Sequence, residues 1–260
     1  MFDLKNKVIV ITGATGVLAS SLAISLAKNN ARLVLLGRNQ KLLDELTKKI
    51  NQYTVVENYT ADVLKKSDLE KVCKKVVKSF DRIDVLVNAV GGNLPGAVIP
   101  DSKSIFDLSE NDFDEVVDLN LKSPFFLTQQ LTSLLEKKGT SENPSRVVNI
   151  ASIDGLHVPF METYSYTASK SGIIHLTRHL AKTLVSKNII VNAIAPGPFD
   201  SHMLGKAVNF DYSLIADSVP RKRIGTPEDI AGLCIYLCSR AGAYTVGETI
   251  TCDGGSIKTL

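Results

Sequence analysis

Short apolar runs rich in valine and isoleucine alternate with longer stretches in which apolar residues recur every three or four positions. The short runs are typical of strands buried on both faces, and the longer stretches are typical of amphipathic helices. Strands are expected at 7–12, 32–36, 55–59, 83–87, 146–150, 189–194 and 249–252. Helices are expected at 17–28, 40–51, 65–79, 109–137 and 166–185, and from 227 onward.

This alternation predicts an α/β fold, namely a Rossmann-type doubly wound parallel sheet of seven strands with helices on both faces. The pattern contains no internal repeat and no Ser/Gly linker, so we expect a single domain over residues 1–260. Ligands of such sheets bind at the carboxyl ends of the strands. The functional residues are therefore expected at the carboxyl ends of the strands.

The composition argues against several classes of function, among them nucleic-acid binding, membrane association and metal binding. The net charge of +3 is spread along the chain and is too weak to favour nucleic acid or an anionic membrane as a partner. No apolar run is long enough for a membrane span, and the N-terminus has no secretory signal. The four cysteines form no C-x-x-C pair, and His175 and His179 lack a third ligand nearby, so no metal site is expected. These features predict a cytoplasmic protein with reduced thiols.

A glycine-rich turn, residues 13–16, follows the first expected strand and leads into an apolar helix. Glycine lets the backbone approach a pyrophosphate closely, and the start of a helix offers it free N–H groups and partial positive charge. By itself such a turn is weak evidence, because tight turns need glycine in any case. The residues expected to bind a dinucleotide here are Gly13, Thr15, Gly16, Val17 and Leu18.

The end of the second expected strand indicates which dinucleotide is bound. An acidic residue there would hold the ribose hydroxyls of NAD, but the sequence has Gly37 followed by Arg38. A guanidinium can hold a 2′-phosphate through two hydrogen bonds, and no carboxylate stands there to repel it. We expect NADP(H) to be preferred over NAD(H); the alternative is that Arg38 is an ordinary surface arginine.

Further residues at strand ends are expected to contact the cofactor. Asp62 could accept a hydrogen bond from the adenine amino group, or it could cap the next helix instead. Small residues after the fourth strand would let the cofactor pass close to the backbone. The expected set comprises Asp62, Val63, Asn88, Ala89, Val90, Pro196, Gly197 and Phe199.

The stretch 148–170 carries the candidate chemistry. Tyr166 and Lys170 lie four residues apart and share one face of a helix, and Ser152 ends the preceding strand. An ammonium group one turn away should lower the pKa of the phenol from its usual value of about 10 and make it a proton carrier near neutrality. The Ser152 hydroxyl could hold a carbonyl or alkoxide oxygen. The Tyr–Lys spacing alone would also fit an ordinary helix.

Taken together, these motifs make the sequence resemble the short-chain dehydrogenase/reductase family over essentially its whole length. The motifs that carry the resemblance are Thr12-Gly13 with Gly16, Asp62, Asn88-Ala89-Val90-Gly91, Asn120, Ser152, Tyr166 with Lys170, Pro196-Gly197 and Asp253-Gly254-Gly255. The family implies that Tyr166 is the general acid/base and that Lys170 lowers its pKa and binds the nicotinamide ribose. It implies that Ser152 holds the substrate oxygen and that Asn120, a poor residue for a helix interior, kinks its helix and anchors a water that relays protons to Lys170.

The glycine-rich turn departs from the family pattern. Val17 and Ala19 stand where the family usually has glycine, and Gly16 comes one residue early. Ala19 adds a methyl group where helix and strand pack closely. We expect a turn of different shape with unchanged chemistry.

Two resemblances within the family compete for the substrate. Residues 91–97 and the first turn are similar to sugar-acid and polyol dehydrogenases of the mannonate/gluconate type. Residues 140–156 and 163–170 are similar to 3-oxoacyl reductases of the rhamnolipid-linked kind, which is the longer match. We therefore expect a carbonyl reductase acting on a 3-oxoacyl thioester-like ketone, with a sugar-acid or polyol dehydrogenase as the alternative. A lid is expected at about 199–219, and the residues expected to contact substrate are Ser152, Asp154, Tyr166, Phe199 and Met203.

A third reading is a redox sensor that binds NADP(H) without catalysis. Such proteins typically lose the tyrosine or the lysine, whereas this chain has both Tyr166 and Lys170. The expected partners are a small carbonyl or alcohol substrate and further copies of the chain, because family members are usually dimers or tetramers.

Overall fold

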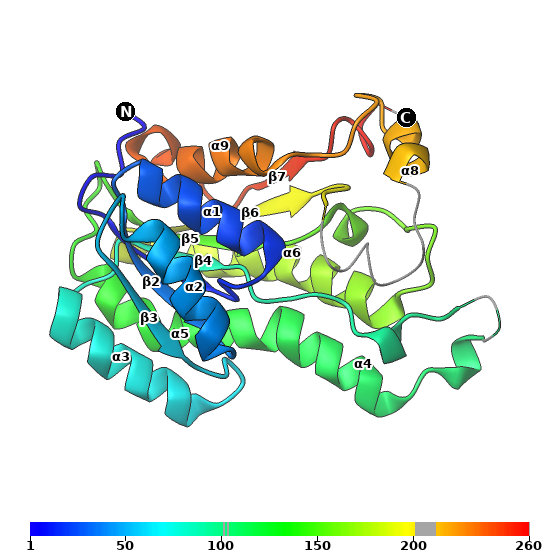
Figure 1. Ribbon diagram of the computed structural model, residues 1–260, viewed down its shortest axis with the longest axis horizontal. Coiled ribbons are helices and arrows are strands. Elements are labelled where there is room, and N and C mark those ends of the chain that lie inside the picture. Colours follow the sequence, from blue (N-terminus) through cyan, green and yellow to red (C-terminus); the bar gives the residue numbers. More distant parts are fainter. Residues whose placement is uncertain (101, 103, 201–211, 260) are drawn as a thin grey trace.

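The seven strands form one parallel sheet in the order β3-β2-β1-β4-β5-β6-β7 (Figure 1). The computed structural model describes residues 1–100, 102, 104–200 and 212–259. The chain passes outward from β1 to β3, returns to β4 beside β1, and then continues to β7, so the order reverses between β1 and β4. Such a reversal opens a crevice at the carboxyl ends of the strands. The strands are β1 (Val8–Thr12), β2 (Arg32–Gly37), β3 (Val56–Thr60), β4 (Val85–Asn88), β5 (Ser145–Ile150), β6 (Ile189–Pro196) and β7 (Thr249–Cys252).

Helices cover both faces of the sheet, as the sequence predicts (Figure 1). Alternate residues of β1 point to opposite faces: Ile9 and Ile11 pack with α1, α2 and α9, whereas Val8 and Val10 pack with α3, α5 and α6. The helices are α1 (Val17–Lys28), α2 (Gln40–Ile50), α3 (Lys66–Phe80), α4 (Glu110–Val117), α5 (Ser123–Glu136), α6 (Tyr164–Leu184), α8 (Tyr212–Ser218) and α9 (Pro227–Cys238). Short 3₁₀ turns are η1 (Pro95–Ala97), η2 (Ile105–Asp107), η4 (Ile153–Gly155), η5 (Val185–Lys187) and η6 (Arg240–Gly242).

The long helix expected at 109–137 is interrupted. A π-helical turn, η3 (Asp118–Lys122), lies between α4 and α5, and Asn120 is buried at its centre. The family resemblance implies a kink at Asn120, and the structure has a π-helical turn there, so only the expectation of an uninterrupted helical stretch is wrong. The cause is the set of hydrogen bonds that the Asn120 side chain makes with a neighbouring turn and with α6, described below.

The described residues contain no helix with the length and uniform apolarity that a membrane span requires. Within the same residues no cluster of three or more His, Cys, Asp or Glu side chains could hold a metal. His175 and His179 lie side by side on α6 without a third ligand. The lid expected at 199–219 lies largely outside the described residues, together with Met203. Its described parts are Phe199 and α8.

Candidate active site

A cleft of about 380 Å³ lies at the carboxyl edge of the sheet, where the strand order reverses. The start of α1, the ends of β4, β5 and β6, η4 and α6 supply its walls. Of the residues that the sequence predicts for the site, those that line the cleft are Gly16, Val17, Leu18, Ala89, Ser152, Asp154, Tyr166, Lys170, Pro196, Gly197 and Phe199.

The start of α1 has the form of a pyrophosphate cradle. No side chain caps this helix, and its first turn carries no acidic residue. The amides of Val17, Leu18 and Ala19 precede the first helical hydrogen bond, from Ser20 N to Gly16 O, and all three residues line the cleft. Uncapped amides and the positive end of a helix suit an anion such as the pyrophosphate of a dinucleotide, so the residues present fit that cofactor.

Gly13 holds the turn before α1 against the end of β4. Its φ of +61° favours glycine, and a Cβ there would lie 2.8 Å from Cα of Val90. The hydroxyl of Thr12 accepts hydrogen bonds from the amides of Ala89 and Val90, both 3.1 Å long. Gly13 and Thr15 do not themselves line the cleft; they shape the turn that presents Gly16 and α1 to it.

Arg38 follows β2 directly and is exposed. Among the described residues its guanidinium has no hydrogen-bond or ion-pair partner, and the first turn of α2 carries no acidic residue. Asn39 caps α2 by accepting a hydrogen bond from the amide of Leu42. A phosphate placed beside Arg38 would thus meet an unpaired cation and no nearby carboxylate in that turn.

Asp62, Val63 and Asn88 stand apart from the walls of the cleft. Asp62 accepts a hydrogen bond from the amide of Leu64 and lies 3.8 Å from the ammonium group of Lys65, so it organises the start of its own loop. The amide nitrogen of Asn88 donates to Asn149 at 2.8 Å, which ties β4 to β5 inside the sheet.

Ser152, Tyr166 and Lys170 converge on one side of the cleft. Ser152 follows β5, whereas the other two lie one turn apart on α6. The ammonium group of Lys170 is 5.6 Å from the centre of the Tyr166 ring and donates a hydrogen bond of 2.9 Å to the carbonyl of Ile150. All three side chains are buried and still border the cleft.

The electrostatics of this group differ from the sequence expectation. Burial raises the pKa of Tyr166, and the nearby Ser152 hydroxyl only partly opposes the effect. Burial also lowers the pKa of Lys170 to about 8. The expected lowering of the tyrosine pKa is therefore wrong, because loss of hydration and the nearby Asp154 carboxylate outweigh the Ser152 hydrogen bond. At neutral pH the phenol carries its proton.

The π-helical turn η3 brings Asn120 to the same place. Its side-chain oxygen accepts from the amide of Gly92 at 2.8 Å, and its nitrogen donates to the carbonyl of Gly92 at 2.9 Å and to Ser169 at 3.1 Å. A Cβ on Gly91 would lie 2.6 Å from the Asn120 oxygen and 3.3 Å from the Lys170 nitrogen. Asn120 thus joins the turn after β4 to α6, with the ammonium group of Lys170 close by.

A model of the family described as Enoyl-(Acyl carrier protein) reductase matches residues 13–256. The rhamnolipids biosynthesis 3-oxoacyl-[acyl-carrier-protein] reductase of Pseudomonas aeruginosa is 32% identical over 256 residues, which cover 98% of this chain and 97% of the relative. The chain belongs to the short-chain dehydrogenase/reductase family. It is accordingly an oxidoreductase that uses a nicotinamide cofactor.

Other relatives within the short-chain dehydrogenase/reductase family carry different names. The 2-dehydro-3-deoxy-D-gluconate 5-dehydrogenase of Escherichia coli is 34% identical over 264 residues, covering 98% of this chain and 96% of the relative. Among solved structures, the Pseudomonas aeruginosa RhlG/NADP active-site complex superposes with a TM-score of 0.90 at 30% identity, covering 98% of both chains.

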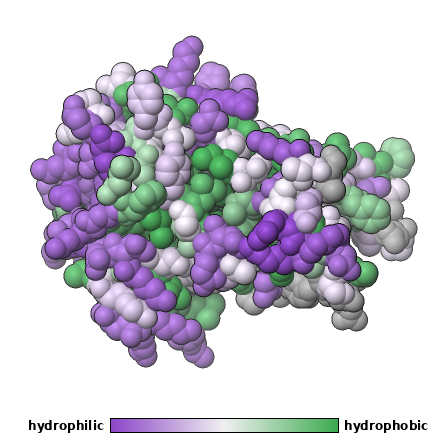
Figure 2. Space-filling model, turned by 90° about the horizontal axis from the view of Figure 1, so that it is seen from above, coloured by the Kyte–Doolittle hydropathy of each residue, from purple (hydrophilic) through white to green (hydrophobic). Residues whose placement is uncertain are grey.

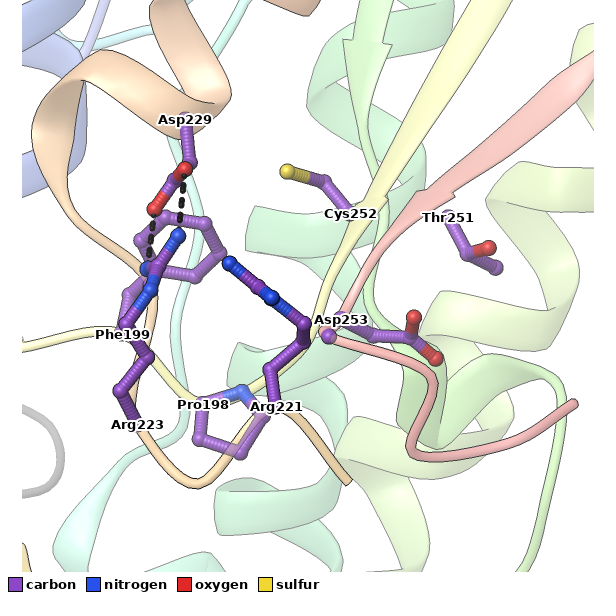
Figure 3. A pocket seen from close by; sticks show the side chains of 10 residues that line it. Pro198, Phe199, Arg221, Arg223, Asp229, Thr251, Cys252 and Asp253 are labelled. Carbon is purple, nitrogen blue, oxygen red and sulfur yellow. Dashed lines mark hydrogen bonds and ion pairs between the residues drawn. The ribbon is translucent and has the colours of Figure 1, made fainter. Parts of the chain in front are cut away.

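Phe199, just beyond β6, lines both the cleft of this short-chain dehydrogenase/reductase and a second hollow of about 270 Å³. Figure 3 shows the second hollow. In that hollow Arg223 forms two hydrogen bonds with Asp229, at 2.6 and 3.0 Å. The pair fixes residues 219–226 to the start of α9, and Gly225 packs on the Phe199 ring and donates from its amide to the carbonyl of Pro198. The Arg223–Asp229 pair and Gly225 therefore hold Phe199 in place as part of the cleft wall.

Sequence reasoning missed much of the cleft wall. Gly91 and Gly92 were recognised only as a cofactor-passing turn, and Ile215 of α8 was placed only within a lid. Ile153 begins the short turn η4 and Met161 lies in a loop, so neither carries a periodic signal. The lining residues that it did not assign are Ala19, Leu22, Gly91, Gly92, Ile150, Ala151, Ile153, Met161, Pro198 and Ile215.

Proposed function

We propose that this enzyme reduces the ketone of a 3-oxoacyl thioester-like substrate to a secondary alcohol, with NADPH preferred over NADH. The observation that carries the proposal is a protonated phenol, Tyr166, beside the hydroxyl of Ser152 in a cleft with otherwise largely apolar walls. Reduction requires a proton donor at the carbonyl oxygen, and a tyrosine whose pKa is raised holds its proton until that oxygen becomes basic.

In this scheme Ser152 and Tyr166 hold the carbonyl oxygen by donating hydrogen bonds to it. When bound, the nicotinamide supplies a hydride to the carbonyl carbon. As charge develops on the oxygen, Tyr166 transfers its proton there, and the positive charge of Lys170 stabilises the phenolate that remains. Asn120 acts as a positioning residue, because it joins the turn after β4 to α6. The role of Asn120 in a water relay to Lys170 stays a prediction.

The walls of the cleft favour an apolar substrate. Val17, Leu18, Ile153, Met161 and Ile215 line it, and none of them can hydrogen bond to a sugar through its side chain. Exposed apolar side chains, among them Leu156, Val158 and Phe160, lie between Ile153 and Met161 in the sequence. In the view from above, hydrophobic residues reach the surface in the middle and toward the right-hand end of the molecule, whereas the left-hand end is mostly hydrophilic (Figure 2).

The second candidate function is a sugar-acid or polyol dehydrogenase. It is favoured by the similarity to a relative named 2-dehydro-3-deoxy-D-gluconate 5-dehydrogenase and by that relative's identity of 34%. A panel assay that follows NADPH absorbance separates the two. We expect acetoacetyl thioesters to be reduced with a kcat/KM at least about tenfold above that for fructuronate or 5-ketogluconate, a difference of about 1.4 kcal/mol in transition-state stabilisation. The reverse order would favour the sugar-acid function.

We also propose that the enzyme forms a dimer or tetramer. Its α4 and α5 present half-exposed aromatic side chains, Phe113 and Phe126, on the helices that flank Asn120. Exposed aromatic side chains on helices are common at contacts between subunits.

A further inference from the structure

The turn η4 places a carboxylate in the cleft. Asp154 lines the cleft together with Ser152, Tyr166 and Lys170, and its side chain is 24% exposed. The proposed reduction assigns no task to this acid. Placing an ionisable side chain in an otherwise largely apolar wall costs free energy, and its charge acts on any substrate that binds beside it.

The position of Asp154 is fixed by the turn. Its amide donates a hydrogen bond of 3.1 Å to the hydroxyl of Ser152, and the next residue, Gly155, is pressed against α6. A Cβ on Gly155 would lie 2.6 Å from the backbone carbon of Lys170, and Ser171 donates a hydrogen bond of 2.9 Å to the Gly155 carbonyl. The carboxylate is therefore held on the same rigid frame as the reacting groups.

The charged groups that face Asp154 come from its own turn and from α6. The imidazole of His157 lies 3.5 Å from the carboxylate at the outer side, where that ring is 40% exposed. Burial raises the pKa of Asp154, and His157 and then Lys170, which faces it from α6, oppose that rise only in part. The ammonium group of Lys170 is buried and donates to the carbonyl of Ile150, so Asp154 is the more accessible of the two charges to a substrate in the cleft.

We propose that Asp154 is a specificity-determining residue that rejects ketones bearing a negative charge close to the reacting carbonyl and admits those with neutral groups there. This inference rests on the proposed function, because it concerns substrates of the same cleft. Two like charges a few ångströms apart in a site of intermediate dielectric repel each other enough to change binding by roughly 10- to 100-fold. A thioester is neutral beside its ketone, whereas a short oxo acid carries a carboxylate there.

The test uses two ketones that differ by one charge, namely 3-oxobutanoate and its methyl ester. We expect the wild type to reduce the ester with the higher kcat/KM, and Asp154→Asn to lower the ester-to-acid ratio by about tenfold or more. Asp154→Glu keeps the charge and should keep the ratio on the wild-type side. Glu162→Gln is the matched control: it removes an exposed carboxylate of the same loop that does not line the cleft, and the ratio should not fall.

The ratio isolates charge from general damage, because a purely structural role of Asp154 would reduce both reactions alike. An unchanged ratio in Asp154→Asn would overturn the inference and leave the proposed function standing. If the wild type reduced neither the ester nor an acetoacetyl thioester, the proposed function would fail. The binding of the same two ketones to the NADP-loaded protein, measured in competition with each other, would then still test the inference. Equal affinity for the ester and the acid would overturn it.

Discussion

The two halves of the cleft present different chemical groups, backbone amides in one and polar side chains in the other. The half beside β1 to β3 offers backbone amides at the uncapped start of α1 and a turn shaped by glycine. The half beside β5 and β6 offers buried polar side chains, Ser152, Tyr166 and Lys170, with Asn120 behind them. Cofactor binding by the first half tolerates many different side chains, because every residue except proline carries an amide N–H. The second depends on particular side chains.

This contrast explains where the chain departs from its family. Val17 and Ala19 replace glycines at the start of α1, yet their amides still precede the first helical hydrogen bond and still border the cleft. Ala19 is buried without displacing the helix from the sheet. No such replacement occurs among Ser152, Tyr166 and Lys170. Substitutions in the second half should therefore have larger effects than those in the first.

The largest effect is expected at Tyr166. Tyr166→Phe removes the proton donor and one of the two hydrogen bonds to the substrate oxygen, so kcat should fall by about 10³-fold or more with little change in KM or in NADPH binding. Steady-state kinetics on an acetoacetyl thioester measure it. Tyr164→Phe is the matched control on the same helix, because that side chain is exposed and its hydroxyl donates to Glu162. Near-normal turnover in Tyr166→Phe would contradict the assigned role.

Lys170 should rank second, and its substitution separates activity from stability. Because burial lowers its pKa to about 8, we expect kcat/KM for reduction to fall as the pH rises through about 8, where Lys170 loses its charge. Lys170→Met should reduce kcat by roughly 10²-fold and abolish that decline. A pH profile of kcat/KM measures both. Lys182→Met, which removes an exposed charge from the last turn of α6, should leave the profile unchanged.

Stability should change in the opposite direction to activity. The pKa of Lys170 lies below its value of 10.5 in the unfolded chain, so between about pH 8 and 10.5 unfolding takes up a proton, and this group makes stability rise with pH. Below pH 8 the burial of the charge costs about 3 kcal/mol. Lys170→Met removes this cost and loses the hydrogen bond to Ile150, so at pH 7 it should unfold at an equal or higher denaturant concentration than the wild type. A clear loss of stability would contradict the assignment of Lys170 as a strained functional group.

The sequence predicted the backbone-built half better than the electrostatics of the other half. The alternation of apolar runs was enough for all seven strands within a few residues. The signal is clearest for the inner strands, which are buried on both faces and therefore uniformly apolar, such as β1. At Asn120 only a kink was expected, from the family resemblance; its π-helical form depends on hydrogen bonds to Gly92 and Ser169, which are remote in sequence. The direction of the Tyr166 pKa was wrong because the extent of burial depends on the whole fold.

The smallest of these effects concerns Arg38, where the first half depends on one side chain. Two charge-assisted hydrogen bonds from an exposed guanidinium to a 2′-phosphate should contribute about 1.5–2 kcal/mol, or about 10- to 30-fold in Kd. Arg38→Ala should therefore weaken NADPH binding by that factor and leave NADH binding nearly unchanged, as measured by fluorescence titration of both cofactors. Lys49→Ala removes a positive charge from the far end of α2 and should change neither the Kd of NADPH nor the Kd of NADH by more than about twofold. If NADPH and NADH respond equally to Arg38→Ala, the preference for NADPH does not come from this arginine, and the whole of the first half holds its cofactor through backbone alone.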